Sequence, residues 1–120
     1  MIRDVLIKND GVADIRKNDE FLIAIVGSHG SLIRLLEIEG IRAETKDYIK
    51  SCRILCRDII RDIKNKRTFD LKRFIKNVEY LDKELNAEFE NNFKINSNRN
   101  AVLSCKDKLS EFVGVLHSVE

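Results

Sequence analysis

The sequence predicts an all-α fold, a small antiparallel four-helix bundle with a short N-terminal segment that we also expect to be helical. The chain has 120 residues, a length that suits one domain, so residues 1–120 are treated as a single helical domain. It contains no proline, although an average composition would give about six, and proline interrupts helix interiors. Apolar residues recur every three or four positions through most of the chain, which is the period of an amphipathic helix.

Four long segments carry this period, at residues 19–39, 42–66, 69–93 and 102–116. In the second segment the apolar residues fall within an arc of about 140° on a helical projection. They are Tyr48, Ile49, Cys52, Leu55, Cys56, Ile59, Ile60 and Ile63. Gly40 is expected to follow the end of the first helix, and Thr68 to cap the third. The connections near 40–42 and 67–69 are so short that the helices they join must be antiparallel neighbours.

Three stretches are less regular. Gly27 and Gly30 lie opposite the apolar face of the first long helix, so we expect a kink near 27–31. The Asn-rich residues 91–100 predict a loop, with one Asn capping the last helix. The N-terminal anchors predict one or two short helical pieces broken at Gly11. These anchors are Ile2, Val5, Leu6, Val12 and Ile15.

Composition excludes several classes of protein. Apolar residues make up 43% of the chain and charged residues 35%. The apolar residues are numerous enough to form a hydrophobic core, which excludes a disordered tail. The longest apolar run, residues 21–26, is far shorter than the roughly 18–20 residues that cross a bilayer, so we expect no membrane partner. No secretory signal is recognisable. Three cysteines favour free thiols in a reducing compartment, which predicts a cytoplasmic protein.

The reactive residue types do not form a recognisable catalytic or metal centre. Residues 27–31 resemble a phosphate loop, but they lack the Gly-Lys-Ser/Thr ending of a Walker motif. We interpret them as small residues that let helices approach closely. His29 is interpreted as a core or boundary imidazole. Cys52, Cys56 and Cys105 lie on apolar helix faces and are interpreted as core thiols in preference to zinc ligands. No carboxylate is expected on an apolar face beside a titratable partner, so we predict no enzyme, no catalytic residue, no cofactor and no metal.

The basic residues are better organised than the acidic ones. Six of them fall within about an 80° strip of the second helix, beside its apolar face: Lys46, Lys50, Arg53, Arg57, Arg61 and Lys64. Residues 61–76 carry a net charge of +5, whereas residues 79–90 carry −4. The predicted partner-binding or nucleic-acid-binding residues are Lys50, Arg53, Arg57, Arg61, Lys64, Arg67 and Arg73. The alternative is a solvated face whose acids and bases pair along the helix.

These patterns favour a protein that acts by binding. The apolar arc of the 19–39 helix spans about 200°, wider than one side of a bundle helix requires, so this helix is expected either at the centre of the bundle or under a partner. We therefore predict an adaptor or regulatory protein that binds a protein partner or another copy of itself. The alternative is sequence-independent nucleic-acid binding through the basic strip of residues 46–76, where Lys and Arg displace counterions from phosphates.

Overall fold

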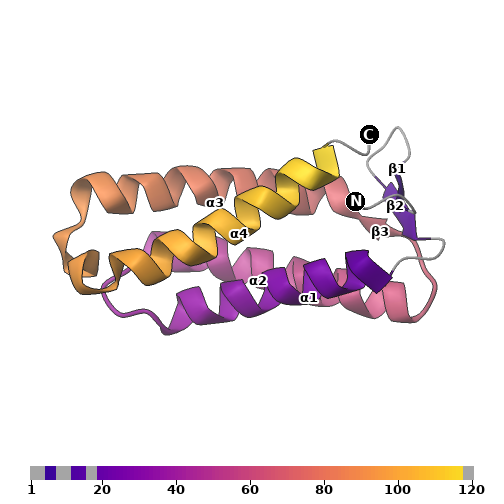
Figure 1. Cartoon of the computed structure of the whole chain (residues 1–120), viewed down its shortest axis with the longest axis horizontal. Helices are drawn as coiled ribbons and strands as arrows, with labels where there is room; N and C mark the ends of the chain where they lie inside the picture. The colour runs from indigo at the N-terminus through magenta and orange to yellow at the C-terminus, as the bar shows by residue number, and fades with distance from the viewer. Residues whose placement is uncertain (1–4, 8–11, 16–18, 118–120) are drawn as a thin grey trace.

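A computed structural model describes residues 5–7, 12–15 and 19–117 of the chain. The elements follow one another as two strands, two long helices, a two-residue strand, a third helix, a short 3-10 helix and a fourth helix (Figure 1). Their bounds are β1 Val5–Ile7, β2 Val12–Ile15, α1 Asp19–Glu37, α2 Ala43–Lys64, β3 Phe69–Asp70, α3 Leu71–Asn91, η1 Phe93–Asn98 and α4 Arg99–His117. Four helices packed against one another confirm the predicted four-helix bundle.

The four helices form a square in which each helix packs against two others. Helix α1 contacts α2 and α4, and α3 contacts the same two neighbours from the opposite side. The chain alternates direction from one helix to the next, as the antiparallel prediction requires (Figure 1). Helix α1 is therefore a corner of the bundle with two neighbours, so of the two alternatives expected for it, a central position does not apply.

The core is mostly apolar and is aromatic at one end. Phe21, Phe69 and Phe112 gather beside the strands, with ring centroids of Phe21 and Phe69, and of Phe21 and Phe112, 5.8 Å apart. Phe74 extends the group, 6.5 Å from Phe112. Tilted rings at these distances are favourable aromatic contacts. Helices from both halves of the chain are thereby joined where the N-terminal strands approach the bundle.

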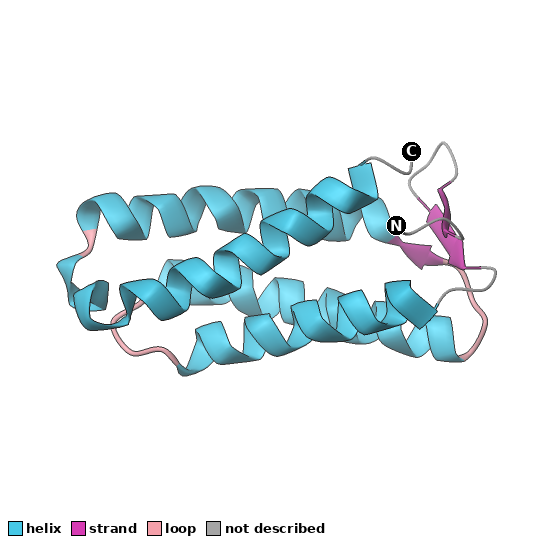
Figure 2. Ribbon diagram, viewed as in Figure 1, coloured by secondary structure: helices cyan, strands magenta, loops and turns pink. Residues whose placement is uncertain are grey.

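The N-terminal segment corrects the sequence prediction. Where the structure describes it, the segment is extended, and β1 and β2 form an antiparallel pair that β3 continues (Figure 2). Val5 lies opposite Ile15, and Ala13 opposite Phe69. Short runs of Val and Ile favour extended backbone, and Phe69–Asp70 supplies a pairing edge immediately before α3. The predicted break at Gly11 and the anchor Ile2 lie outside the described residues.

The helix ends agree with the predictions in part. Gly40 follows α1 with φ +94°, and a Cβ there would lie 2.5 Å from the Lys94 carbonyl oxygen, so the turn requires glycine. Helix α3 is capped by Asp70, whose side chain accepts a hydrogen bond from the Arg73 N–H, and the prediction that Thr68 caps it is wrong. Helix α1 continues through Gly27 and Gly30 without interruption.

The Asn-rich stretch contains more structure than a loop. Residues 93–98 form the 3-10 helix η1, and the Asn92 side chain caps it by accepting from the Lys94 N–H. Helix α4 follows directly at Arg99. Among the helices that the structure describes, none is long and apolar enough to cross a membrane.

Candidate functional site

The outer face of α1 is apolar and uncovered by the rest of the described chain. Ile23 is 71% exposed, Val26 48% and Ile33 37%. Gly27 and Gly30 lie between them, and a Cβ built on either glycine meets no atom within 4 Å. We call these five residues the apolar stripe. From residue 21 to residue 33 the helix carries no Asp, Glu, Lys or Arg, in a chain that is 35% charged.

The basic residues of α2 lie beside this stripe. Arg53 and Arg57 are close enough to His29 of α1 for their charges to lower the pKa of its imidazole, so this side of α2 is turned toward α1. We call Lys46, Lys50, Arg53, Arg57, Arg61 and Lys64 the basic strip, and the apolar stripe and basic strip together the α1/α2 face. The sequence predicted the strip, but not that an uncharged helix face would be its neighbour.

The contact between α1 and α2 contains two buried polar atoms without a hydrogen bond. They are His29 Nε2 and Arg53 Nε. Burial is the main cause of the lowered pKa of His29, followed by the positive charges of Arg53 and Arg57. The imidazole is therefore neutral at neutral pH. Both side chains are only partly buried, and these two nitrogens are the atoms of the contact that the described chain leaves without a partner.

Most of the strip's charge is available to a partner. Arg61 lies 3.5 Å from Asp58 and 3.9 Å from Asp62, and Arg57 lies 3.9 Å from Asp58. These are long, exposed pairs of a kind worth about 0–1 kcal/mol. In the described part of the chain, Lys50 forms no ion pair. A ligand with negative charge would therefore compete with weak contacts only.

The seven predicted binding residues do not all share one surface. Lys50, Arg53, Arg57, Arg61 and Lys64 lie on α2. Arg67 follows in the turn, where its N–H donates to the Asp62 carbonyl, and Arg73 is in the first turn of α3. The α1/α2 face therefore contains five of the seven, together with an apolar component from α1.

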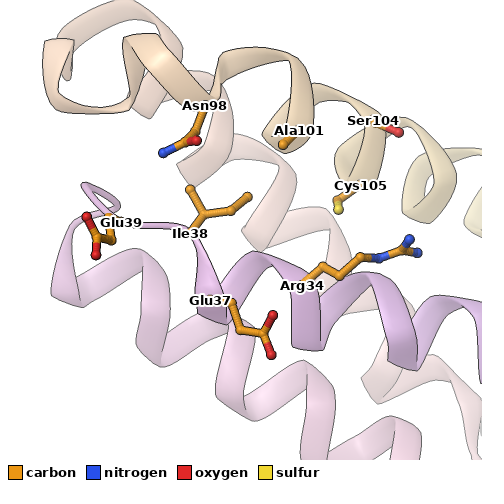
Figure 3. Close-up of a pocket in the computed structure, with 8 residues that line it drawn as sticks. All are labelled: Arg34, Glu37, Ile38, Glu39, Asn98, Ala101, Ser104 and Cys105. Atoms are coloured by element: carbon orange, nitrogen blue, oxygen red, sulfur yellow. The ribbon is translucent and has the colours of Figure 1, made fainter.

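An open depression lies between α1 and the start of α4 (Figure 3). It has a volume of about 630 Å³ and is lined by Arg34, Glu37, Ile38, Glu39, Asn98, Ala101, Ser104 and Cys105. Arg34 Nη2 donates to Ser31 Oγ at 3.5 Å. Burial raises the pKa of the Cys105 thiol, which keeps it protonated and a poor nucleophile. The depression holds no nucleophile with an adjacent base.

A buried acid is the residue that sequence reasoning missed. Glu88 is fully buried and accepts hydrogen bonds from Thr45 Oγ1 and Arg42 Nε, both at 2.7 Å, from the Arg42 N–H at 3.2 Å, and from Asn92 Nδ2. Burial raises its pKa, but the hydrogen bonds from Asn92, Arg42 and Thr45 outweigh that effect, and the pKa lies below its usual value. The prediction that no carboxylate lies on an apolar face beside a titratable partner is therefore wrong.

The position of Glu88 could have been found. It follows Leu81 and Leu85 at steps of four and three, so it lies on the apolar side of α3. Asn92 also donates to the Gly40 carbonyl at 2.8 Å. The cluster thus joins α3 to the start of α2 and the turn before it, a structural role at the end of the bundle far from the strands (Figure 1).

The cysteines lie in the core, as interpreted from the sequence. Cys52 and Cys56 are free and fully buried, and Cys105 is buried on α4. Burial raises the pKa of Cys52 to about 12, and that of Cys56 further in the same direction. Among the described residues, no three His, Cys, Asp or Glu side chains come together where they would hold a metal ion.

No protein-family model, curated protein or solved structure matches this chain. Any functional assignment therefore depends on the described residues themselves.

Proposed function

We propose that this chain is a non-enzymatic adaptor or regulatory protein that binds a protein partner through the α1/α2 face. The observation that supports this most is the apolar stripe, a helix face that is both exposed and uncharged in a highly charged chain. Contiguous exposed apolar surface rimmed by polar residues is typical of interaction sites.

The two components of the face have different energetic roles. Burying an exposed aliphatic side chain completely is worth about 1.5–3 kcal/mol, so Ile23, Val26 and Ile33 supply affinity. The basic strip supplies long-range attraction and selects the partner by charge. This division matches interfaces in which an apolar centre is bordered by charged residues.

Site-specific photo-cross-linking tests this proposal. A photoreactive amino acid is placed at Val26 or, as a control, at Tyr80 on α3, two positions with similar exposure of 48% and 44%. We expect a discrete protein partner, or a second copy of the chain, to be cross-linked from position 26 and not from position 80. The same products from both positions, or none from position 26, would remove the α1/α2 face from consideration.

Sequence-independent nucleic-acid binding is the second candidate, and the basic strip is the observation that favours it. Affinity would fall steeply with salt, because bound phosphates release counterions. A gel shift with DNA and RNA at two salt concentrations tests it. Arg57→Glu/Arg61→Glu should weaken binding and reduce the salt slope, whereas Lys83→Glu/Lys108→Glu, which makes the same charge change at exposed sites elsewhere, should not. Equal effects of the two variants would exclude the strip.

A further inference from the structure

We infer that the partner of the α1/α2 face is an amphipathic helix of another protein, with an apolar side bordered by Asp and Glu. This inference rests on the proposed function and specifies its partner. Three features support it: the alignment of the apolar stripe with the basic strip, the two glycines, and the charges on the rest of the chain.

The stripe and the strip run side by side for most of their lengths. Helices α1 and α2 are antiparallel neighbours, and His29 lies near Arg53 and Arg57. Ile33 is therefore level with the region of Lys50, and Ile23 with the region of Arg61. At a rise of 1.5 Å per residue, the stripe extends over about 15 Å and the strip over about 27 Å. A helix of about 18 residues has the length of the strip.

The glycines favour a helical occupant. The distance between two packed helices depends on the side chains at their contact and is about 8–10 Å. Gly27 and Gly30 leave Val26 as the one side chain of the stripe between Ile23 and Ile33, and the space above both glycines is open. A partner helix can therefore approach the α1 backbone closely, with Ile23 and Ile33 flanking its point of contact.

The charge of the basic strip favours a partner helix with acidic residues along one edge. A helix lying on the apolar stripe has one edge beside the basic strip, whose side chains Lys50, Arg57 and Arg61 are exposed. Acidic residues along that edge would meet these charges, whereas basic residues would be repelled. Nucleic acid would neutralise the strip but would leave the isoleucines of the stripe uncovered.

A second copy of the chain does not fit these requirements as well. If two α1 helices pack antiparallel across a two-fold axis, both α2 helices lie on the same side of the interface, and their basic strips face each other. If they pack parallel, each strip faces α4 of the other copy, and α4 carries more basic than acidic residues. Three acidic residues of α3 are already paired within the chain, since Glu88 binds Arg42, Glu84 contacts Arg42, and Asp82 lies 3.1 Å from Lys106.

Three synthetic peptides test the inference with the full chain. The first is an 18-residue amphipathic helix with a leucine stripe bordered by Glu; the second has Lys in place of Glu; the third keeps Glu and has Ser in place of the leucines. We expect the first to bind with a Kd at least about tenfold lower than either of the others, by calorimetry at physiological salt. Equal binding of the first two peptides would overturn the inference.

Reciprocal variants assign the binding to the face. Lys50→Glu/Arg57→Glu should weaken binding of the Glu peptide by about tenfold and strengthen binding of the Lys peptide. Damage to the fold would not produce such a gain in affinity. Lys83→Glu/Lys108→Glu should change neither, and Val26→Ser should weaken the Glu peptide. If Lys50→Glu/Arg57→Glu still prefers the Glu peptide over the Lys peptide, the inference is overturned. It is also overturned if light scattering shows that the chain is a dimer and that Ile33→Ser converts the dimer to a monomer. If position 26 still cross-links a partner while the peptides are not distinguished, the proposed function stands and the acidic helix does not.

Discussion

Two clusters of polar groups are buried in this bundle, and they are built in opposite ways. Around Glu88 the carboxylate accepts hydrogen bonds from Arg42, Thr45 and Asn92. Between α1 and α2, His29 Nε2 and Arg53 Nε are buried without a partner. The first cluster joins three segments of the chain. The second leaves positive charge and polar atoms beside an exposed apolar face.

Stability and binding are located in different parts of this fold. A buried charge is tolerated when its hydrogen bonds are satisfied, and removing one member then leaves the others unpaired. The Glu88 cluster meets this condition and supports the end of the bundle. His29 Nε2 and Arg53 Nε do not meet it, and they adjoin the surface to which we assign function. Variants of the two regions should therefore separate a loss of folding from a loss of binding.

Removing the buried acid should have the largest effect on folding. Glu88→Ala leaves the Arg42 guanidinium, the Thr45 hydroxyl and the Asn92 amide without their shared acceptor. Leaving the Thr45 hydroxyl and the Asn92 amide unpaired costs about 1–3 kcal/mol each, whereas Arg42, whose side chain is 42% exposed, is left to solvent. Urea denaturation should show a decrease in the free energy of unfolding of the size of these two costs together. The control Glu90→Ala, an exposed acid on the same helix, should change stability by less than about 0.5 kcal/mol.

The turn next to the Glu88 cluster should be the next most sensitive position. Gly40 has φ +94°, and a Cβ there would lie 2.5 Å from the Lys94 carbonyl oxygen. Left-handed backbone costs a non-glycine residue about 1–2 kcal/mol, and the contact with Lys94 adds to this. Gly40→Ala should therefore lower the free energy of unfolding by at least about 2 kcal/mol. Wild-type stability of this variant would show that the turn rearranges freely.

Substituting glycine by alanine on the apolar stripe should raise the free energy of unfolding, the opposite of the effect at Gly40. Gly27 and Gly30 lie in the middle of α1, with open space where a Cβ would be. Glycine inside a helix is less stable than alanine by about 0.5–1 kcal/mol. Gly27→Ala and Gly30→Ala should each raise the free energy of unfolding by about that amount, measured by thermal or urea denaturation. If either variant is destabilised, the helix face is covered or distorted, and the comparison of the two regions fails.

The sequence was sufficient for the helices because each buries one continuous apolar stripe, and a period of 3.6 residues repeated over five turns has no other structural explanation. It was insufficient for the N-terminal segment. The run Val5–Ile7 is too short for its period to distinguish a helix from a strand. The pairing of Ala13 with Phe69 depends on residues that are distant in the chain.

The basic strip of the candidate site was predictable from the sequence, whereas its position beside α1 was not. The spacing of Lys50, Arg53 and Arg57 placed them on one side of a helix without reference to any neighbour. The identity of that neighbour, α1, depends on how four helices are ordered around a core, which the individual helix patterns do not specify. For the same reason the partners of Glu88 were missed, since Arg42 is 46 positions away along the chain.

Acid titration should separate the two polar clusters with the smallest perturbation. The pKa of His29 is lowered in the folded state by burial and then by Arg53 and Arg57, so the unfolded chain binds a proton more readily. Stability should consequently decrease as the pH falls below the unfolded value of about 6.5. The pKa of Glu88 is also lowered, but for an acid the stabilising charge is present above the unfolded value of about 4.3 and is lost only as the pH falls through the lower folded value.

The upper pH range therefore reports on His29 and the lower pH range on Glu88. His29→Gln should remove the decrease in the free energy of unfolding that begins near pH 6.5 and leave the one below about pH 4 intact. Glu88→Gln should do the reverse, from a lower starting stability. Urea denaturation at closely spaced pH values between about 3 and 7 measures both. If His29→Gln leaves the upper range unchanged, the imidazole is already paired in solution, and the contact between α1 and α2 is as well satisfied as the one around Glu88.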